Sequence, residues 1–242
     1  MADGKKTHRL VKTPRISARL LADYMAASDM ARRTILVGCK YQPIARVVQH
    51  DEAKQTLSKF FRAENPEIDS LNVAAAKLRA RMHDTEFDRD LYDHNAEYLE
   101  RAAQVVPQME LPEAEFLNPG TNPAIMIEGV KVNPDIQFRL RRVTKTNKIR
   151  VGAATFRYAK GKALKPDTGN WQSAFLLAYL GLTETEDGAE PEGKLCVTID
   201  AYSGACHYAP GDSVSRLKNM KAACAGIVER WDNIQPPANA VI

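Results

Sequence analysis

Basic side chains gather in one segment of the chain, and this cluster is the strongest chemical signal in the sequence. From Phe138 to Lys165 there are ten lysines and arginines and no acidic residue. Such an asymmetry creates a local positive field, which predicts a surface that attracts phosphate-bearing ligands. Lysines also protect sheet edges from mispairing, which is the simpler explanation for part of the cluster. The ten residues are Arg139, Arg141, Arg142, Lys145, Lys148, Arg150, Arg157, Lys160, Lys162 and Lys165.

Other residue types offer less chemistry. The cysteines lie far apart without a CxxC pair, so we expect reduced thiols in packed positions rather than disulfides or a zinc site. Ser203 and His207 are close in sequence, but no G-x-S-x-G motif surrounds the serine, and a hairpin turn explains both residues. Trp171 and Trp231 are more typical of core anchors than of platforms for bases. The cysteines are Cys39, Cys196, Cys206 and Cys224.

The first half of the chain has the pattern of helices. From Ser17 onward apolar residues recur at three- and four-residue spacing, which predicts a series of amphipathic helices. Asn65-Pro66 marks a stop and a restart within the series. The predicted helices begin at Ser17 and then cover 29–37, 52–61, 66–82 and 86–105.

The second half of the chain mixes strands and helices. Ile136, Phe138 and Leu140 alternate with polar residues, which is the two-residue period of a strand with one polar face. A second strand is predicted over 149–158, where Gly152 allows close approach of a neighbour. The other predicted elements are a β-rich segment over 124–132 with a turn at 128–129, a turn over 144–147, a helix over 171–182 capped by Asp167 or Thr168, an acidic surface loop over 184–192, a hairpin over 195–208 and a helix over 214–231.

We therefore expect an α+β protein, in which a helical N-terminal region precedes a core with a mixed sheet flanked by helices. Hydrophobic residues make up 44% of the chain and charged residues 26%, a composition typical of a packed protein. Four prolines punctuate a linker-like stretch before residue 124. The predicted division is a flexible basic arm over 1–14, a helical region over 15–106 whose last helix packs on the core, a linker over 107–123, the core over 124–234 and a loose tail over 235–242.

The predicted order helix, three strands, helix, strand, with one further strand and helix, resembles the core of the PD-(D/E)XK nuclease superfamily over about residues 86–231. Pro134-Asp135 stands at the start of the second strand, where the family places its metal-binding aspartate. The third strand follows across a short turn and ends in lysines. Asn170-Trp171-Gln172 resembles the glutamine-containing helix of the RecB-like branch. The resemblance implies a restriction-endonuclease-like αβββαβ fold that contacts phosphodiesters.

The resemblance also implies roles for particular residues. Asp135 would be a catalytic ligand of Mg²⁺, which lowers the pKa of an attacking water. Lys160 would be the catalytic lysine that orients this water. Glu128 or a helix carboxylate, Glu97 or Glu100, would complete the metal site.

This chain departs from the family in its third strand. The strand contains neither Asp nor Glu, so the (D/E)xK element is missing, and Ala153 and Thr155 would occupy its positions in the usual register. Gln172 could bond a phosphate or a neighbouring loop, and the sequence leaves both open.

These features predict a nucleic-acid-binding protein, with DNA favoured over RNA, that performs Mg²⁺-dependent phosphodiester hydrolysis in bacterial or phage DNA processing or defence. The missing carboxylate leaves open a catalytically inactive adaptor on the same scaffold. A third alternative is a protein-interaction module, such as a phage inhibitor, whose basic face recognises an acidic protein.

We expect a cytoplasmic protein without a membrane span. No apolar run follows the basic N-terminus, and no window approaches about 18 consecutive apolar residues. Basic residues of the N-terminal helices could extend a phosphate-contacting surface, form the outer face of a bundle, or lie in a contact of a homo-oligomer. These residues are Arg15, Arg19, Arg32, Arg33, Lys40 and Arg46.

Overall fold

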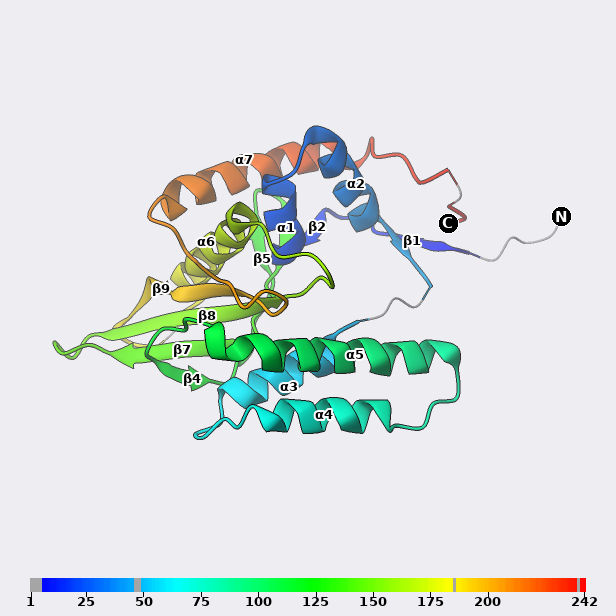
Figure 1. Cartoon of the computed structure of the whole chain (residues 1–242). Helices are drawn as coiled ribbons and strands as arrows, with labels where there is room; N and C mark the ends of the chain where they lie inside the picture. The colour runs from blue at the N-terminus through cyan, green and yellow to red at the C-terminus, as the bar shows by residue number, and fades with distance from the viewer. Residues whose placement is uncertain (1–5, 46–48, 185, 239) are drawn as a thin grey trace.

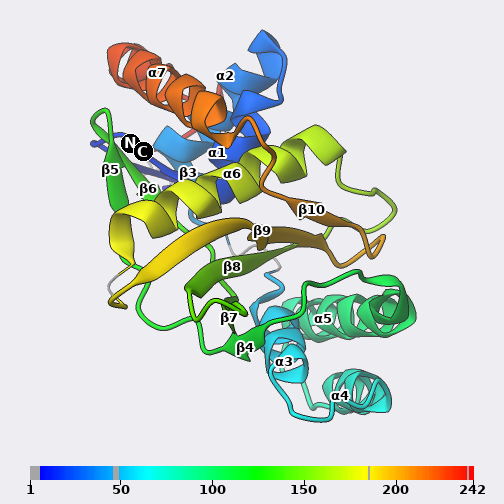
Figure 2. The same ribbon diagram turned by 90° about the vertical axis from the view of Figure 1, so that its left-hand side faces the viewer.

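A five-stranded mixed sheet forms the centre of the fold in the computed structural model, which describes residues 6–45, 49–184, 186–238 and 240–242. Its strands are β4 (Glu115–Leu117), β7 (Phe138–Val143), β8 (Ile149–Arg157), β9 (Ala189–Asp200) and β10 (Cys206–Tyr208). They lie side by side in the order β10-β9-β8-β7-β4, as Figure 2 shows. β8 and β9 run parallel, and the other neighbours are antiparallel.

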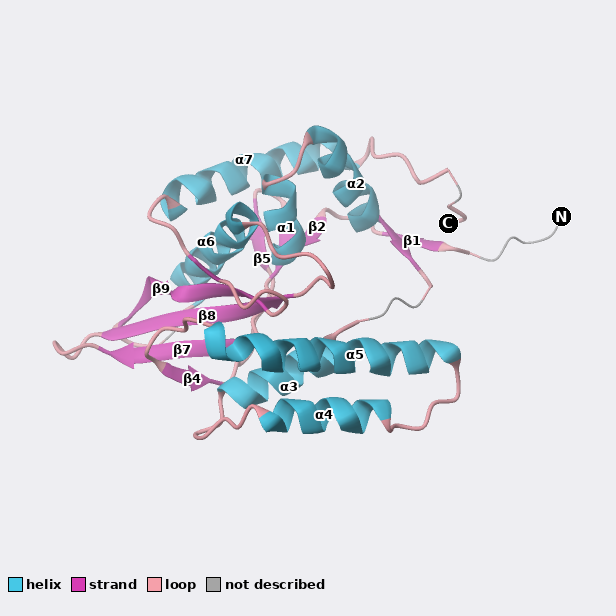
Figure 3. Ribbon diagram, in the orientation of Figure 1, coloured by secondary structure: helices cyan, strands magenta, loops and turns pink. Residues whose placement is uncertain are grey.

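Helices cover both faces of this sheet (Figures 1 and 3). The helices are α1 (Ala18–Met25), α2 (Asp29–Lys40), α3 (Asp51–Phe61), α4 (Asp69–Arg79), α5 (Glu86–Val105), the 3-10 helix η1 (Val106–Gln108), α6 (Pro166–Thr183) and α7 (Ser213–Trp231). α3, α4 and α5 form the layer on one side, whereas α6 packs on the other side and contacts α1 and α7. Within the described residues, no helix is long and apolar enough to cross a membrane.

Two smaller sheets join segments that are distant in the sequence. β1 (His8–Leu10) pairs with β3 (Tyr41–Pro43). β2 (Arg15–Ser17) lies parallel to β6 (Val130–Asn133), which forms a hairpin with β5 (Ile125–Ile127). The start of the chain is thereby attached to the second half of the fold.

The main sheet separates two hydrophobic clusters. On β8, Phe156 faces the cluster on the α5 side together with Phe138, whereas Ala153 faces the cluster on the α6 side. Successive strand residues point to opposite faces, so Thr155 and Arg157 also point towards α6. Both are buried, which puts polar groups inside the protein at the end of this strand.

The α+β class and the mixed sheet flanked by helices are confirmed. Helix α5 begins and ends at the predicted residues. Its beginning is fixed by Thr85, whose hydroxyl accepts a hydrogen bond from the Asp88 amide at 3.1 Å and caps the first turn. The predicted turn at 128–129, where Glu128 and Gly129 have positive φ, and the predicted hairpin over 195–208 are also present.

The predicted start of α6 at Trp171, with Asp167 or Thr168 as cap, is wrong. The helix begins at Pro166, and Lys165 is its N-cap. Proline suits the first position of a helix, because the amide hydrogen that it lacks would have no intrahelical acceptor at that position. The residues that we expected to cap the helix therefore lie within its first turn.

Four short strands, β1 to β4, lie where the sequence gave no strand signal. β4 lies in the segment that we expected to be a linker, and it occupies the sheet edge beside β7. The β5–β6 hairpin, which we expected to begin the main sheet, belongs to the smaller one. At the chain ends, β1 lies in the expected arm, and the amides of Thr7 and His8 donate to Val241 O at 2.9 and 3.1 Å. Three-residue strands are too short to show a period, so only their distant partners define them.

The acidic segment 184–192 is a loop only in its first part. β9 begins at Ala189, and its first residues pair with the beginning of β8, with Glu190 opposite Arg150. Proline and several glutamates disfavour a strand locally, but pairing with a basic neighbour stabilises it.

Candidate functional site

A polar crevice of about 570 Å³ opens where the parallel strands β8 and β9 end. One wall is α1, and the other is the loop that joins β8 to α6. The carboxyl ends of parallel strands and the first turn of the helix between them meet at one edge of a sheet, which is where open α/β sheets bind ligands. The charged residues that line the crevice are Arg19, Asp23, Arg157, Lys162, Lys165 and Asp200.

Arg157, the last residue of β8, forms the buried floor of the crevice, with 8% of its surface exposed. One terminal nitrogen donates to Asp23 Oδ1 at 2.5 Å, and the other donates to Gln172 Oε1 at 3.0 Å and to Arg19 O at 3.2 Å. Burial lowers the pKa of this guanidinium, and the charge of Asp23 opposes the shift. The side chain is therefore fixed in place as a paired charge.

Asp200 stands opposite Arg157 at the end of β9 and is also buried. Its Oδ2 accepts from the amide of Leu164 at 2.8 Å and from the hydroxyl of Ser203 at 2.5 Å, and its Oδ1 accepts from the amide of Tyr202 at 3.0 Å. The carboxylate thus fixes the loop that forms one wall of the crevice. Ser203 has the turn role that its sequence context indicates.

Three cations at the crevice remain uncompensated. Arg19, Lys162 and Lys165 are exposed, and none of them has an ion-pair partner among the residues that the structure describes. With Arg157, four cations and two carboxylates line the crevice, so its net charge is +2 and its potential favours an anion.

The four other arginines of β7 and β8, by contrast, are paired with acids of one segment. The partners come from the segment 184–192, which lies beside these strands because β9 runs along β8. Exposed pairs of this kind add little stability, but they cancel much of the local field. The pairs are Arg139 with Glu184 at 3.8 Å, Arg141 with Glu186 at 2.8 Å, Arg142 with Glu192, and Arg150 with Glu190.

The remaining predicted contact residues divide into exposed and buried ones. Lys145 and Lys148 lie in the turn between β7 and β8, without an ion pair in the described part of the chain. Gln172 is buried, and it bonds Arg157 and, at 3.4 Å, the Thr155 hydroxyl. These partners belong to strand β8 and not to a loop, and the contact of Gln172 with phosphate stays a prediction. Arg46, from the N-terminal set, lies outside the described residues.

Asp135, the expected metal ligand, is held by two neighbours. Its Oδ2 accepts from Lys54 Nζ at 3.0 Å, and its Oδ1 accepts from Gln137 Nε2 at 2.8 Å. Lys54 comes from α3, so an ion pair links the helical layer to the start of β7. This cation competes for the oxygens that would ligate a metal.

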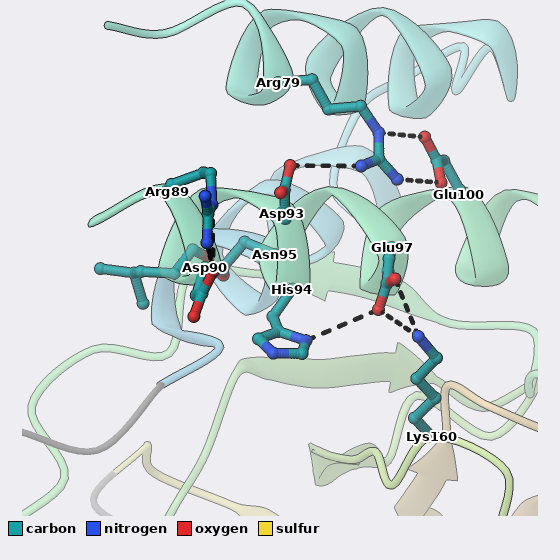
Figure 4. Close-up of polar contacts among 10 residues, drawn as sticks. Arg79, Arg89, Asp90, Asp93, His94, Asn95, Glu97, Glu100 and Lys160 are labelled. Atoms are coloured by element: carbon teal, nitrogen blue, oxygen red, sulfur yellow. Dashed lines mark hydrogen bonds and ion pairs between the residues drawn. The ribbon is translucent and has the colours of Figure 1, made fainter. Parts of the chain in front are cut away.

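Glu97 and Lys160, two further residues implied by the resemblance, bind each other (Figure 4). Lys160 Nζ lies 2.8 Å from both carboxylate oxygens of Glu97, and His94 Nδ1 lies 3.5 Å from one of them. The hydrogen bond from Lys160 lowers the pKa of Glu97. The pair joins α5 to the loop after β8.

The carboxylates that the resemblance assigns to Mg²⁺ do not share a site. Glu128 lies in the β5–β6 turn, where a Cβ on the next residue, Gly129, would lie 3.1 Å from Val228 of α7. Asp135 and Glu97 each bind a lysine instead. Within the described residues, no three His, Cys, Asp or Glu side chains form a group that could hold a metal. Lysines thus hold two of the three carboxylates, and Mg²⁺ binding stays a prediction.

An aromatic group adjoins the crevice. Tyr158 lines the crevice, and its ring centroid lies 4.3 Å from that of Tyr98 and 5.2 Å from that of His50. The Tyr98 hydroxyl and His50 Nδ1 are buried without a hydrogen-bond partner in the described structure. Burial raises the pKa of Tyr98 well above its ordinary value, so its hydroxyl stays protonated.

Sequence reasoning missed Asp23, Lys54 and Asp200 as members of this site, whereas Arg19 was among the N-terminal cations that could extend a phosphate-contacting surface. Asp23 and Lys54 lie on helices among other charged residues, and their spacing does not distinguish them. Asp200 has one local signal, because an aspartate just before a tight turn commonly accepts hydrogen bonds from turn amides.

His207 gives a testable pH dependence. It is buried against Gly169 of α6, and its Nε2 has no partner among the described residues. Burial lowers its pKa below the ordinary 6.5, and Asp200 partly opposes this shift. The unfolded chain therefore binds more protons than the folded one as the pH falls below 6.5, and stability is lost in that range.

We expect the urea midpoint to be lower at about pH 5.5 than at about pH 7.5, and the difference to be smaller in His207→Gln. His83→Gln, at an exposed loop position, is the control. An unchanged pH dependence in His207→Gln would show that other groups cause it. His50 is one of these groups, since its pKa is also lowered, chiefly by burial.

The fold and the site define an α+β protein with a basic crevice at the end of a mixed sheet. No protein-family model matches the chain, and no curated protein matches its sequence.

Proposed function

We propose that this chain is a nucleic-acid-binding protein that receives backbone phosphate in the crevice between α1 and the ends of β8 and β9. The observation that supports this proposal is the presence of three exposed cations without ion pairs, Arg19, Lys162 and Lys165, around one polar recess. Phosphate contacts of lysine and arginine supply most non-specific affinity for nucleic acids. DNA is favoured over RNA as the ligand.

The order of elements supports a nuclease-like scaffold for this function. α5, β4, β7, β8, α6 and β9 come in this chain order, with the β5–β6 hairpin of the smaller sheet between β4 and β7. In the main sheet, β4, β7, β8 and β9 are neighbours in that order. Asp135 precedes the second of these strands. The proposal is that the scaffold of a PD-(D/E)XK nuclease serves binding here, as an adaptor without hydrolysis of its own, because lysines occupy the carboxylates Asp135 and Glu97.

Binding is tested by fluorescence anisotropy with labelled single-stranded DNA, duplex DNA and RNA over a series of salt concentrations. Lys162→Glu combined with Lys165→Glu is expected to weaken binding by about tenfold or more and to reduce the salt dependence, because two phosphate contacts are lost. Lys145→Glu combined with Lys148→Glu makes the same charge change in the β7–β8 turn and is expected to have the smaller effect. Equal losses in both double variants would contradict the crevice as the binding site.

The same measurement separates nucleic acid from an acidic protein as the partner. A steep fall of DNA affinity with salt reflects counterion release from the phosphate backbone. If DNA does not bind even at low salt, the alternative of a protein-interaction module is favoured.

A second candidate function is metal-dependent phosphodiester hydrolysis, which the position of Asp135 before the second core strand favours. Supercoiled plasmid, single-stranded DNA and RNA are incubated with the protein and Mg²⁺, Mn²⁺ or EDTA. We expect no cleavage by the parent protein. Metal-dependent cleavage that disappears in Asp135→Ala would overturn the adaptor proposal in favour of a nuclease, whereas cleavage that survives this change would place the active site elsewhere.

A further inference from the structure

We infer that the crevice recognises a terminal phosphate monoester, carried by the end of a strand or by a free nucleotide, rather than the side of a duplex. This inference rests on the proposed function and specifies its ligand. The chemistry shared by both sources is a phosphate dianion attached to a nucleoside.

The distribution of free charge limits the length of nucleic acid that can be held. A protein that follows a backbone needs a row of cations, one for each phosphate that it contacts. The arginines of β7 and β8 would form such a row, but Arg139, Arg141, Arg142 and Arg150 are paired with the acids of segment 184–192. Near the crevice, the unpaired charge of the described residues is concentrated at its mouth.

The size of the crevice agrees with a ligand of one or two nucleotide units. Its volume of about 570 Å³ lies within the range of about 300–1,000 Å³ that is typical of pockets for small molecules. α1 and the β8–α6 loop enclose it from two sides, so a continuous duplex contacts only its rim. A strand end or a nucleotide can enter.

The charge of the crevice favours a monoester over a diester. A terminal phosphate carries about −1.5 to −2 at neutral pH, whereas a backbone diester carries a single negative charge. Arg19, Lys162 and Lys165 face one recess, and its two acids, Asp23 and Asp200, are already bonded to Arg157 and to the loop. Four cations and two carboxylates line the crevice, and the resulting net charge of +2 attracts a dianion more strongly than a monoanion.

Tyr158 provides a surface for the attached base. It is the aromatic residue among those that line the crevice, and its ring centroid lies 4.3 Å from that of the fully buried Tyr98. Stacking of a base on an aromatic ring tolerates every base, so this contact would add affinity without sequence preference.

The test uses a labelled single strand of about twelve nucleotides that carries a 5′-phosphate, a 3′-phosphate or no terminal phosphate. We expect one phosphorylated end to bind about tenfold or more tightly than the unphosphorylated strand, and this advantage to vanish in Lys162→Glu with Lys165→Glu. AMP should compete with the phosphorylated strand better than inorganic phosphate does. Tyr158→Ala should remove the advantage of AMP over phosphate, and Tyr158→Phe, which retains the ring, should keep it.

The outcomes separate the inference from the proposed function. If all three strands bind equally but the Lys162/Lys165 variant weakens them all, the preference for a terminal phosphate is refuted and nucleic-acid binding in the crevice stands. If that variant changes no affinity, both fail. AMP binding as tight as the phosphorylated strand would identify a free nucleotide as the source of the monoester, and much weaker AMP binding would identify a strand end. Urea unfolding of each variant confirms that it is folded.

Discussion

Gly152→Ala is expected to destabilise the protein by about 3 kcal/mol or more, because the added methyl group has no room. A Cβ at this position of β8 would lie 2.1 Å from the carbonyl oxygen of Leu195 and 2.3 Å from its Cβ. Leu195 is fully buried in β9, and the pairing of the two strands is irregular between Val151 and Ala153. The clash is with backbone, so the two central strands would have to separate.

Urea unfolding followed by tryptophan fluorescence measures this effect. Gly181→Ala is the matched control, because the same substitution in α6 meets no atom within 4 Å. The control variant is expected to be as stable as the parent or more stable by up to about 1 kcal/mol, because alanine has a higher helix propensity than glycine. An unfolding midpoint of Gly152→Ala equal to that of the parent would show that β8 and β9 do not approach as closely as described.

Lys40→Met is expected to cost about 3 kcal/mol of stability, because it removes a buried cation that caps α7. Lys40 has 7% of its surface exposed, and its ammonium group donates to the carbonyl oxygens of Trp231, Asp232 and Ile234 at 2.7, 3.1 and 3.2 Å. These carbonyls lie at the helix end, where no intrahelical amide reaches them. Methionine fills the space but removes all three bonds. The Trp231 oxygen then keeps only the Ile234 amide at 3.3 Å, and the Ile234 oxygen keeps only the Tyr41 hydroxyl at 2.9 Å.

The control for this prediction is Lys12→Met, which makes the same exchange at an exposed position near the same contacts. The backbone oxygen of Lys12 accepts from the Trp231 indole at 3.1 Å, and the substitution preserves it. We expect a change within about 0.5 kcal/mol for this variant. Equal midpoints of the two variants in urea would contradict the assignment of Lys40 as a cap. Lys40 is buried, so it fits none of the three interpretations of the N-terminal basic residues, which were a phosphate-contacting surface, the outer face of a bundle and an oligomer contact.

The basic cluster shows which features of the site the sequence predicts and which it does not. The ten cations and the acidic segment 184–192 are both evident in the sequence, but more than thirty residues separate most of the partners. Only the crossover through α6 brings β9 beside β8 and so places Glu190 and Glu192 next to Arg150 and Arg142. Charges that appear as one surface in the sequence are therefore mostly pairs in the fold.

Local patterns by themselves determined the α+β class, most helices, the two hairpins and the close approach at Gly152, because each depends on the periodicity or conformational freedom of neighbouring residues. The tertiary structure alone decided the place of β4 in the main sheet, the burial of Lys40 and Gln172, and the assembly of the crevice from α1, β8 and β9. The physical reason is that these features arise from contacts between distant segments. Which cation meets a carboxylate and which stays free is set by packing, and no spacing along the chain encodes it.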